Sequence, residues 1–559
     1  MTEVETSPAR QALTLLAVVV LVASAGCTGL GQRVSGDDAA AEIQFENATA
    51  ASGLDYSDTV ERGGAGNGNA GVYAVDYDRD GYTDLLTLGG ERPALFRNGG
   101  GEFERSGQLS GLNRSYKSAA VVDYDGDGWQ DVLLLARNGS AVALHNDEGS
   151  LERTDVGLGA FTNPLGAATA DYDGDGDQDL FVYQSGRWTE GTPAGRFAGQ
   201  GFVAEDNGNP NYLYENTEEG FQRVEDAGIG GERWSLAASF VDLTGDGRPD
   251  VHVANDYNSD ILYVNQGDGE FEQRVIGGHT ARNGMASEVV DVDGDGRLDV
   301  FTTNIELPIT RDSVGRERYR RIEQILTFVI HSDRTLGNTL LVNRGNGTFI
   351  DRADAYGVQV GGWGWEASFA DFDNDGRRDL IHTTQEVVRI DPDDPTFTYP
   401  MLWRNNGSGF TSLDADARGL DEHNGRGMAT LDYDRDGDQD VVVATYDGPV
   451  VVYENTVPRR TNSIEFRVIA AGGNGTAVGA TVTVEAGDRS TSVVQHSRTG
   501  YLSRDSPVSH LGTGSADEVT LRVSWPDGTT RTFDGVAVNQ RVRVTNSGVE
   551  TVSRFDGDE

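Results

Sequence analysis

The chain has 559 residues, of which 90 are acidic and 45 basic, so its formal net charge is −45. This negative potential argues against a nucleic-acid partner, because the phosphate backbone carries the same sign. A hydrophobic content of 37% together with 74 glycines suits many short strands joined by tight turns and excludes a fold made of long helices.

The basic residues are unusual, because Lys117 is the only lysine and all the others are arginine. An acidic, lysine-poor chain resembles the proteins of salt-loving archaea, in which a high salt concentration screens the repulsion between surface charges. The alternative explanation of this acidic, lysine-poor composition is a GC-rich genome, which favours Arg, Gly and Asp codons.

Residues 1–27 are expected to form a secretory signal. The apolar run from Ala12 to Gly26 is shorter than the ~20 residues that a membrane-spanning helix needs. The sequence "SAGC" ends this run at Cys27, the only cysteine, and resembles a lipobox, which implies a lipid on Cys27. A signal that is simply cleaved and a short uncut anchor are the alternatives. We expect a protein on the extracellular face of the membrane, lipid-anchored or secreted, with a linker over residues 28–41.

Seven copies of the pattern D-x-[DT]-x-D-G-x-x-D lie within residues 42–456, and they begin at Asp76, Asp123, Asp171, Asp242, Asp291, Asp371 and Asp432. Oxygen ligands on alternate residues of a tight loop suit Ca²⁺, which takes about 6–8 oxygens. Glycine at position 6 permits the sharp turn. A single copy is explained equally well as turn chemistry. Seven copies in the same frame predict up to seven calcium sites.

In each copy we predict side-chain ligands at positions 1, 3, 5 and 9 and a backbone carbonyl ligand at position 7. The predicted metal ligands are Asp76, Asp78, Asp80, Tyr82, Asp84, Asp123, Asp125, Asp127, Trp129, Asp131, Asp171, Asp173, Asp175, Asp177, Asp179, Asp242, Thr244, Asp246, Arg248, Asp250, Asp291, Asp293, Asp295, Arg297, Asp299, Asp371, Asp373, Asp375, Arg377, Asp379, Asp432, Asp434, Asp436, Asp438 and Asp440. The neutral Thr244 predicts a weaker fourth site. An EF-hand is not expected, because strands flank the loops and position 12 is not Glu.

Each repeat contains four β-prone stretches, of which one leads into the Asp loop, one leaves it, and the third ends in a turn of the type N-x-G-x-G-x-F. Four antiparallel strands in each of seven repeats predict an all-β fold with a seven-bladed β-propeller. The last repeat lacks a fourth strand, which we expect residues near Phe45 to supply. Long insertions, roughly residues 184–210, 304–337 and 384–399, follow second strands and are expected on the face opposite the Asp loops.

The second insertion is the most distinctive loop. Ile322, Ile325, Leu326 and Val329 form a helical stripe. Basic and aromatic residues near it suggest an anionic partner, and they are Arg316, Arg320, Arg334, Arg233, Trp234, Arg282, Trp363, Trp365 and Arg426. A solvated helix is the alternative for the arginines, and packing between blades is the alternative for Trp363 and Trp365.

The repeats, as in "GWGWEASFADFDNDG", resemble the FG-GAP/VCBS repeats of integrin-type propellers and the cartilage-acidic-protein group. The stretches "SRTGYLSRDSPVSHLGTG" and "VTLRVSWPDGTTRTFDGV" resemble the ASPIC/UnbV domain. Alternating residues over 457–546 predict a small β-sandwich-like domain, followed by an acidic tail at 547–559. His510, Trp525 and Asp505 are either a site or packing and turn residues. The resemblance implies extracellular calcium binding and interaction, without a settled chemistry.

The sequence therefore favours an exported, surface-anchored calcium-binding propeller protein that acts in adhesion or binds a glycan or protein ligand. A polysaccharide lyase or hydrolase built on a calcium-bearing propeller is the alternative. The sequence has no G-x-S-x-G elbow, no H-E-x-x-H and no nucleophilic cysteine. Paired catalytic carboxylates cannot be recognised among so many acids, so no catalytic residue is assigned.

Overall fold

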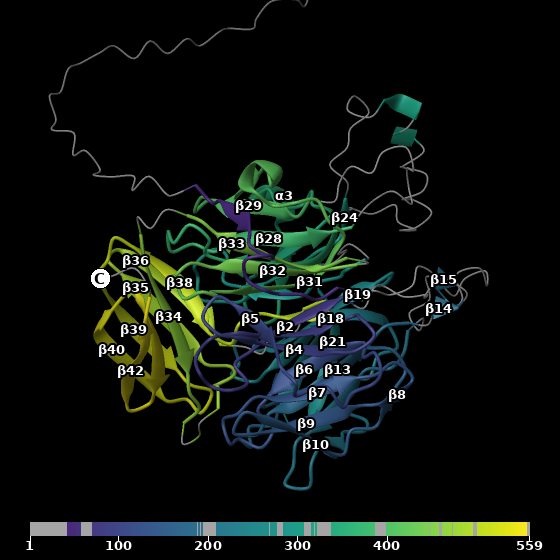
Figure 1. The fold of residues 1–559 in the computed structure, drawn as a ribbon. Helices are drawn as coiled ribbons and strands as arrows, with labels where there is room; N and C mark the ends of the chain where they lie inside the picture. Colours follow the sequence, from purple (N-terminus) through teal and green to yellow (C-terminus); the bar gives the residue numbers. More distant parts are fainter. Residues whose placement is uncertain are drawn as a thin grey trace, which may run out of the picture. The chain divides into compact units, whose positions relative to one another are not determined.

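Short β-strands on either side of the Asp loops make up most of the structure, which is a computed structural model (Figure 1). In the first repeat, "GVYAV" forms β2 (Gly71–Val75) and "DLLTL" forms β3 (Asp84–Leu88). The two strands are antiparallel, with Val75 opposite Asp84, and every residue in them is buried. A strand buried on both faces is a continuous apolar run, which explains why these stretches do not alternate.

The structure describes residues 42–57, 70–186, 188–189, 192–193, 208–267, 269–276, 283–306, 315–317, 319–320, 337–385, 399–446, 448–457, 461–471, 473, 475–495 and 500–555. The signal segment with Cys27, the linker, the apolar stripe of the second insertion, Arg282 and Arg334 lie outside these residues. Within the described part of the chain, no helix has both the length and the apolar character needed to cross a membrane.

The described residues form seven sheets of the expected kind, with antiparallel strands in simple order from the first strand outwards. We number them blades one to seven. Their strands are β2, β3, β4 (Ala94–Asn98) and β5 (Phe103–Arg105); β6 (Ser118–Val122), β7 (Asp131–Leu135), β9 (Val142–Asp147) and β10 (Ser150–Thr154); β12 (Pro164–Ala170), β13 (Asp179–Gln184), β16 (Tyr212–Glu215) and β17 (Gln222–Arg223); β18 (Trp234–Val241), β19 (Asp250–Asp256), β20 (Ile261–Gly267) and β21 (Glu270–Val275); β22 (Glu288–Val290), β23 (Asp299–Thr302), β25 (Thr339–Asn343) and β26 (Phe349–Asp351); β27 (Gly362–Ala370), β28 (Asp379–Thr384), β29 (Met401–Asn405) and β30 (Phe410–Leu413); β31 (Gly425–Leu431), β32 (Asp440–Thr445), β33 (Val450–Asn455) and β1 (Phe45–Asn47).

Minor elements decorate the blades. The paired strands are β8 (Gly139–Ser140) with β11 (Ala160–Phe161), β14 (Trp188–Thr189) with β15 (Thr192–Pro193), and β24 (Ile305–Glu306) with β27. Two short helical turns, α3 (Ala353–Tyr356) and η2 (Asp416–Arg418), follow the fourth strands of blades five and six.

The ring closes through the N-terminal strand, as the sequence predicts. β1 pairs with β33, and Phe45 lies opposite Asn455. An apolar cluster containing Val72 of blade one and Val442 of blade seven seals the closure, and similar clusters lie between the other neighbouring blades. The interface between blades is therefore a layer of buried apolar side chains, as is typical of a propeller.

The C-terminal domain consists of two four-stranded sheets. One has the order β38 (Ser509–Gly514), β34 (Asn462–Val468), β41 (Gln540–Thr545) and β42 (Gly548–Arg554), and the other has the order β36 (Arg489–Val494), β35 (Thr481–Ala486), β39 (Glu518–Ser524) and β40 (Thr530–Ala537). Both sheets contribute to one buried cluster, which includes Phe466 and Leu521. The boundary predicted between the domain and an acidic tail at 547–559 is wrong. Residues 548–554 form β42, which pairs with β41 and completes the sheet.

One segment of the C-terminal domain enters the propeller. This inserted segment (residues 500–506) contains β37 (Ser503–Arg504), which pairs in parallel with β2 of blade one. Tyr501 and Leu502 are fully buried in an apolar cluster that includes residues of blades three and four, and the Tyr501 ring lies 4.7 Å from that of Trp365 in blade six. The two domains therefore share a core, which the sequence does not reveal.

Candidate metal centres

The aspartate at position 9 has the same structural role in every Asp loop. One carboxylate oxygen accepts the backbone N–H of position 2, as in Tyr77 N to Asp84 Oδ2 at 3.1 Å, and the other accepts the N–H of an asparagine that ends the third strand, as in Asn98 N to Asp84 Oδ1 at 2.8 Å. The corresponding pairs of bonds are present at Asp131, Asp179, Asp250, Asp299, Asp379 and Asp440. Position 9 thus fixes the loop to its blade, and its remaining lone pairs face the loop.

The third-strand asparagines connect neighbouring blades. Asn146 Nδ2 of blade two donates to Tyr77 O in the Asp loop of blade one at 2.9 Å, and Asn98 Nδ2 of blade one donates to Tyr433 O of blade seven at 2.7 Å. Equivalent bonds join Asn216, Asn265, Asn343 and Asn455 to the preceding loops. The N-x-G turn marks these residues in the sequence, but only the closed ring shows that they bridge the candidate metal loops.

Predicted side-chain ligands converge as the metal hypothesis requires, at positions 1, 3 and 9 in three loops and at positions 1, 3 and 5 in a fourth. Carboxylate oxygens lie within 4.8 Å of one another in groups that include Asp76, Asp78 and Asp84; Asp123, Asp125 and Asp131; Asp171, Asp173 and Asp179; and Asp291, Asp293 and Asp295. Position 5 is held by its own turn, since the backbone N–H of position 7 donates to it in every loop, as in Tyr82 N to Asp80 Oδ1. The structure thus brings predicted side-chain ligands together, while the role of the position 7 carbonyls stays a prediction.

Several oxygen atoms at predicted ligand positions are buried without a hydrogen-bond partner. They are Asp76 Oδ1 and Asp123 Oδ1 at position 1, and Thr244 Oγ1 and Asp373 Oδ1 at position 3. Leaving a buried polar atom unpaired costs about 1–3 kcal/mol, so these atoms need a further partner. A hard cation bound by oxygen ligands would supply it, and the donor set therefore fits calcium.

Burial and mutual repulsion raise the pKa of these carboxyl groups. Burial raises the pKa of Asp84 and of Asp179 to about 8. Burial and the neighbouring Asp127 and Asp125 raise the pKa of Asp123 to about 6. A bound cation would offset this repulsion and hold the groups in the ionised form.

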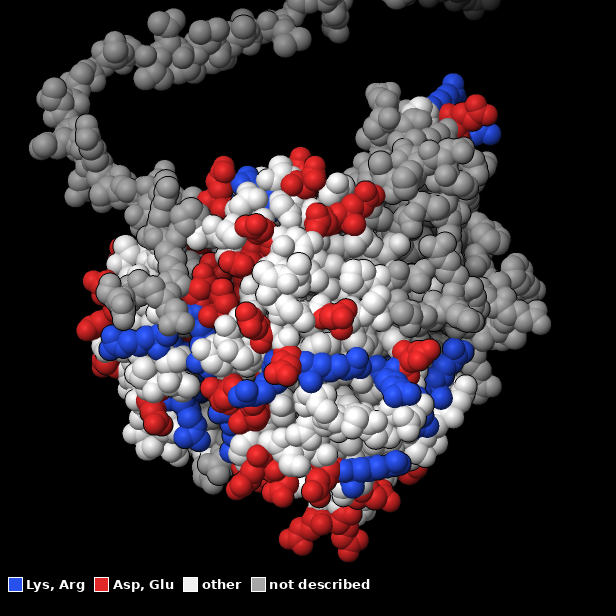
Figure 2. All heavy atoms as spheres, in the orientation of Figure 1, with Lys and Arg blue, Asp and Glu red and all other residues white. Residues whose placement is uncertain are grey.

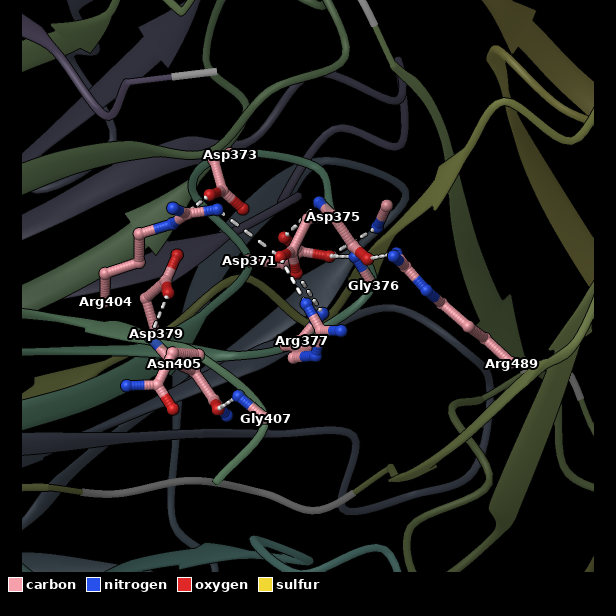
Figure 3. Close-up of polar contacts among 12 residues, drawn as sticks. Asp371, Asp373, Asp375, Gly376, Arg377, Asp379, Arg404, Asn405, Gly407 and Arg489 are labelled. Atoms are coloured by element: carbon pink, nitrogen blue, oxygen red, sulfur yellow. Dashed lines mark hydrogen bonds and ion pairs between the residues drawn. The ribbon is translucent and has the colours of Figure 1, made fainter. Parts of the chain in front are cut away.

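The seven loops differ in the residue that precedes the third-strand asparagine. Arg97 pairs with Asp78 and Asp80 in blade one, and Arg404 Nε donates to Asp373 at 2.6 Å in blade six (Figure 3). Blade two has a histidine at this place, His145, whose Nδ1 lies 3.3 Å from both Asp125 and Asp131. Blades three and seven instead have Glu215 and Glu454, and blades four and five have Val264 and Val342. The charge around each loop therefore varies more than the single Thr244 exchange suggests.

Arginine at position 7 also lies against the loops. Arg248, Arg297 and Arg377 each form an ion pair with the aspartate two residues before. The side chain at position 7 differs among the seven loops, and it is arginine in blades four, five and six. The structure shows that where it is arginine it neutralises part of the loop charge, because its length lets it fold back onto position 5.

The C-terminal domain contacts the Asp loops at the glycine of position 6. In blade six, Thr491 Oγ1 donates to Gly376 O at 3.0 Å. The Arg489 guanidinium donates to the neighbouring carbonyl oxygen of Asp375 (Figure 3). In blade seven, Ser463 Oγ donates to Gly437 O at 2.6 Å. In blade one, Arg541 reaches Gly81 O. The loops of blades six and seven are buried by this cover, whereas those of blades three to five are largely exposed.

The other candidate residues take part in packing within the described structure. His510 Nε2 lies 3.2 Å from Gly437 O, and burial lowers the pKa of His510 to about 4. Trp525 Nε1 donates to Ile469 O, and Asp505 accepts Thr430 N and the Ser368 hydroxyl. Trp365 is buried, and the Arg426 guanidinium lies 4.4 Å above its ring.

The remaining basic candidates are only partly described. Trp363 is half-buried against the same cluster as Trp365, Arg233 and Trp234 are buried, and Arg316 and Arg320 are exposed. The face drawn in Figure 2 shows that charge is not uniform, because basic side chains form a band between acidic regions.

Comparisons with known proteins agree with this geometry. The family model of the FG-GAP-like repeat matches residues 76–134, 123–182, 202–253, 242–302 and 326–382. Together these spans contain the Asp loops of blades one to six, and each span ends on the second strand that follows a loop. The family model named ASPIC and UnbV matches residues 470–551. None of the curated proteins compared with the chain matches it.

Two of the solved structures found are similar in fold at low identity. One is "Crystal structure of BBS1N in complex with ARL6DN, soaked with lead", at 9% identity and a TM-score of 0.39, covering 73% of this chain and 96% of that one. The other is the WD40 domain of Toxoplasma gondii coronin, at 12% identity and a TM-score of 0.39, covering 75% and 87%.

The repeats and their Asp loops define a β-propeller protein built of FG-GAP-like repeats. The chain ends in an ASPIC and UnbV domain, and the sheets of that domain cover part of the loop face.

Proposed function

We propose that this protein is an exported, surface-anchored calcium-binding propeller that acts in adhesion, by binding a glycan or protein ligand. The observation that carries the proposal is the set of converging carboxylates in the Asp loops, together with buried ligand oxygens that lack a partner. Calcium supplies charge neutralisation and a cross-link between the strands on either side of each loop. The protein's own residues then present a rigid ring on which exposed loops can bind a partner.

Export and anchoring rest on the sequence of the first 27 residues. An apolar run that ends in small residues directly before Cys27 supports a lipid-modified N-terminus. A cell-fractionation experiment with Cys27→Ser tests this part. We expect an unprocessed precursor or release into the medium, and unchanged membrane retention with normal processing would contradict the anchor.

Calcium binding is tested by equilibrium dialysis with the full chain. Asp173→Asn is a suitable variant, because the amide keeps the oxygen that accepts Asp175 N but removes one charge from the blade-three loop. At a limiting free calcium concentration we expect the variant to bind close to one ion fewer than the native protein. Asp55→Asn, which removes an exposed charge outside the loops, is the matched control. No bound calcium in the native protein would end the proposal.

Ligand binding is tested by adhesion to anionic polysaccharides. Arg316→Glu with Arg320→Glu reverses two exposed charges, and we expect weaker adhesion with an unchanged melting temperature. Equal adhesion would remove this loop from the binding surface. The same polysaccharides are monitored for ultraviolet absorbance, since steady production of unsaturated sugar would identify a lyase instead.

A further inference from the structure

A cavity of about 280 Å³ lies where the C-terminal domain meets the Asp loops of blades two and three. Asp123, Asp177 and Gln178 line it from the propeller. Arg467, Thr476 and Arg504 line it from the C-terminal domain. Its volume is near the lower limit of small-molecule pockets, which suits a ligand of the size of one sugar.

Two arginines bring positive charge to this cavity, and the carboxylates of Asp76 and Asp123 offset part of the charge of Arg467. Arg504 is only 8% exposed and donates to Ala74 O at 3.2 Å, while Arg467 Nε donates to Thr476 Oγ1 at 2.8 Å. Among the described residues, neither guanidinium forms an ion pair within 4.0 Å. Burial, and the charge of Arg467 beside it, lower the pKa of Arg504 to about 10. An anion between the two guanidiniums would offset both the burial of their charge and their mutual repulsion. A carboxylate fits the planar, forked geometry of the guanidinium group.

The rest of the lining is uncharged and combines apolar residues such as Val121 and Val478 with a few polar side chains. Gln178 Oε1 is buried without a hydrogen-bond partner, and the side chains of Thr169 and Thr476 face the same cavity. An amide and hydroxyls of this kind can both donate hydrogen bonds to the hydroxyls of a sugar and accept hydrogen bonds from them. Carboxylate and hydroxyl recognition are thus combined in one cavity.

The propeller side makes the cavity sensitive to calcium. Asp123 and Asp177 belong to two Asp loops, and without a cation their negative charge opposes the entry of an anion. When the loops hold calcium, that repulsion is offset and the positive charge of Arg467 and Arg504 dominates.

We propose that this cavity binds a uronate, a small acidic sugar, with its carboxylate between Arg467 and Arg504 and its hydroxyls on Gln178 and Thr476. The calcium dependence of this binding rests on the proposed function, whereas the recognition of the sugar rests on the cavity itself.

The experiment is isothermal titration of the full chain with glucuronate in the presence of calcium. We expect measurable binding of glucuronate, and binding at least tenfold weaker for glucose, which lacks the carboxylate, and for acetate, which lacks the hydroxyls. Inorganic phosphate tests a general oxyanion site. Equal binding of glucose, or tighter binding of phosphate, would overturn the assignment of a uronate.

Two variants place the binding in this cavity. Arg467→Gln removes one guanidinium and should weaken glucuronate at least tenfold. Arg543→Gln removes the same charge from the paired position on β41, outside the lining, and should bind normally. Ala471→Trp adds bulk at an exposed lining residue and should block binding without touching a metal ligand. Native affinity in both Arg467→Gln and Ala471→Trp would overturn the site.

Calcium stoichiometry is measured on the same samples to separate the two hypotheses. Calcium binding without glucuronate binding would overturn this inference and leave the proposed function standing. Absence of calcium would overturn the proposed function. Equal glucuronate affinity with and without chelator would overturn the calcium dependence.

Discussion

The Asp loops of blades six and seven and those of blades three to five share one motif but lie in different surroundings. Asp371 and Asp375 are 1% and 6% exposed beneath the C-terminal domain, whereas Asp173 and Asp293 lie open to solvent. Side chains of the covering domain donate hydrogen bonds to the backbone carbonyls at position 6. These carbonyls point towards the covering domain only when the loop keeps its tight turn. The comparison teaches that a loop and its cover support each other, so metal binding and domain docking are linked.

The largest effect is expected from calcium removal, which tests the comparison directly. With free calcium ~100-fold above Kd, each site adds up to about 2.7 kcal/mol, so several sites rival the whole stability of a domain. After mixing with chelator, we expect a fast loss of calcium from the exposed loops and a slower loss from the covered ones. Stopped-flow with a fluorescent chelator measures both phases. If all calcium were lost in one kinetic phase, and Asp371→Asn did not change that phase, the covering domain would not slow calcium loss from the loops beneath it.

The metal-free protein is expected to lose stability as the pH rises. Burial raises the pKa of Asp179 to about 8 and of Asp299 to about 7 in the exposed half, and raises the pKa of Asp379 and Asp440 in the covered half well above its usual value. A carboxyl group whose pKa is raised on folding stabilises the folded state at pH values below its pKa in the unfolded chain, about 4. This contribution to stability disappears as the pH rises towards 8.

Thermal melting with chelator, between pH 5 and 8, measures the effect. Calcium should reverse the trend, since it binds the ionised groups. A melting temperature of the metal-free protein that rises with pH would contradict the raised pKa values.

A methyl group at Gly500 should separate the two domains. A Cβ there would overlap the Glu366 carboxylate, which accepts Tyr501 N inside the propeller. We expect Gly500→Ala to destabilise by about 1–3 kcal/mol, as overpacking in a core does, and to expose the covered loops to chelator. Gly548→Ala, with open space around its Cβ, is the control. Slow calcium loss retained in Gly500→Ala would show that the cover holds without the inserted segment.

The asparagine bridges should contribute equally to the free energy of unfolding in the exposed and in the covered loops. This is the smallest difference that we expect. Asn216 Nδ2 bonds Tyr124 O in the exposed part, and Asn455 Nδ2 bonds Phe372 O beneath the cover. Truncation to alanine leaves a carbonyl unpaired, half-buried at Tyr124 and buried at Phe372, so each should cost about 1–3 kcal/mol. Urea unfolding in saturating calcium compares them. A clearly larger cost for Asn455→Ala would extend the influence of the cover to the bridges.

The sequence predicts the propeller well because its signals are local and repeated. Apolar runs around each Asp loop specify the first two strands. The missing fourth strand of the last repeat predicts pairing with Phe45, and the antiparallel pairing of Phe45 with Asn455 confirms it. The convergence of positions 1, 3 and 9 follows from the nine-residue spacing.

What the sequence could not predict depends on contacts between distant residues. Nothing near Asp371 indicates that Gly512 N donates to its carboxylate, and nothing near Tyr501 indicates a place inside the ring. The ion pairs of Arg97 and Arg404 also need the third strand to lie over the loop. The signals available were an apolar Tyr-Leu pair next to Gly500 and an arginine before the asparagine, and both are too common to assign alone.

The pairing of β1 with β33 has a consequence for how the chain folds. The strand made first must wait for a partner made after six complete blades, so the ring remains open with two bare sheet edges until residues 450–455 are available. Contacts so distant along the chain form slowly. The inserted segment is made later still, and it enters a ring that has just closed. A chain cut short before residue 450 would therefore expose edges prone to aggregation, and a chain cut shortly after residue 455 would form a closed ring without its cover.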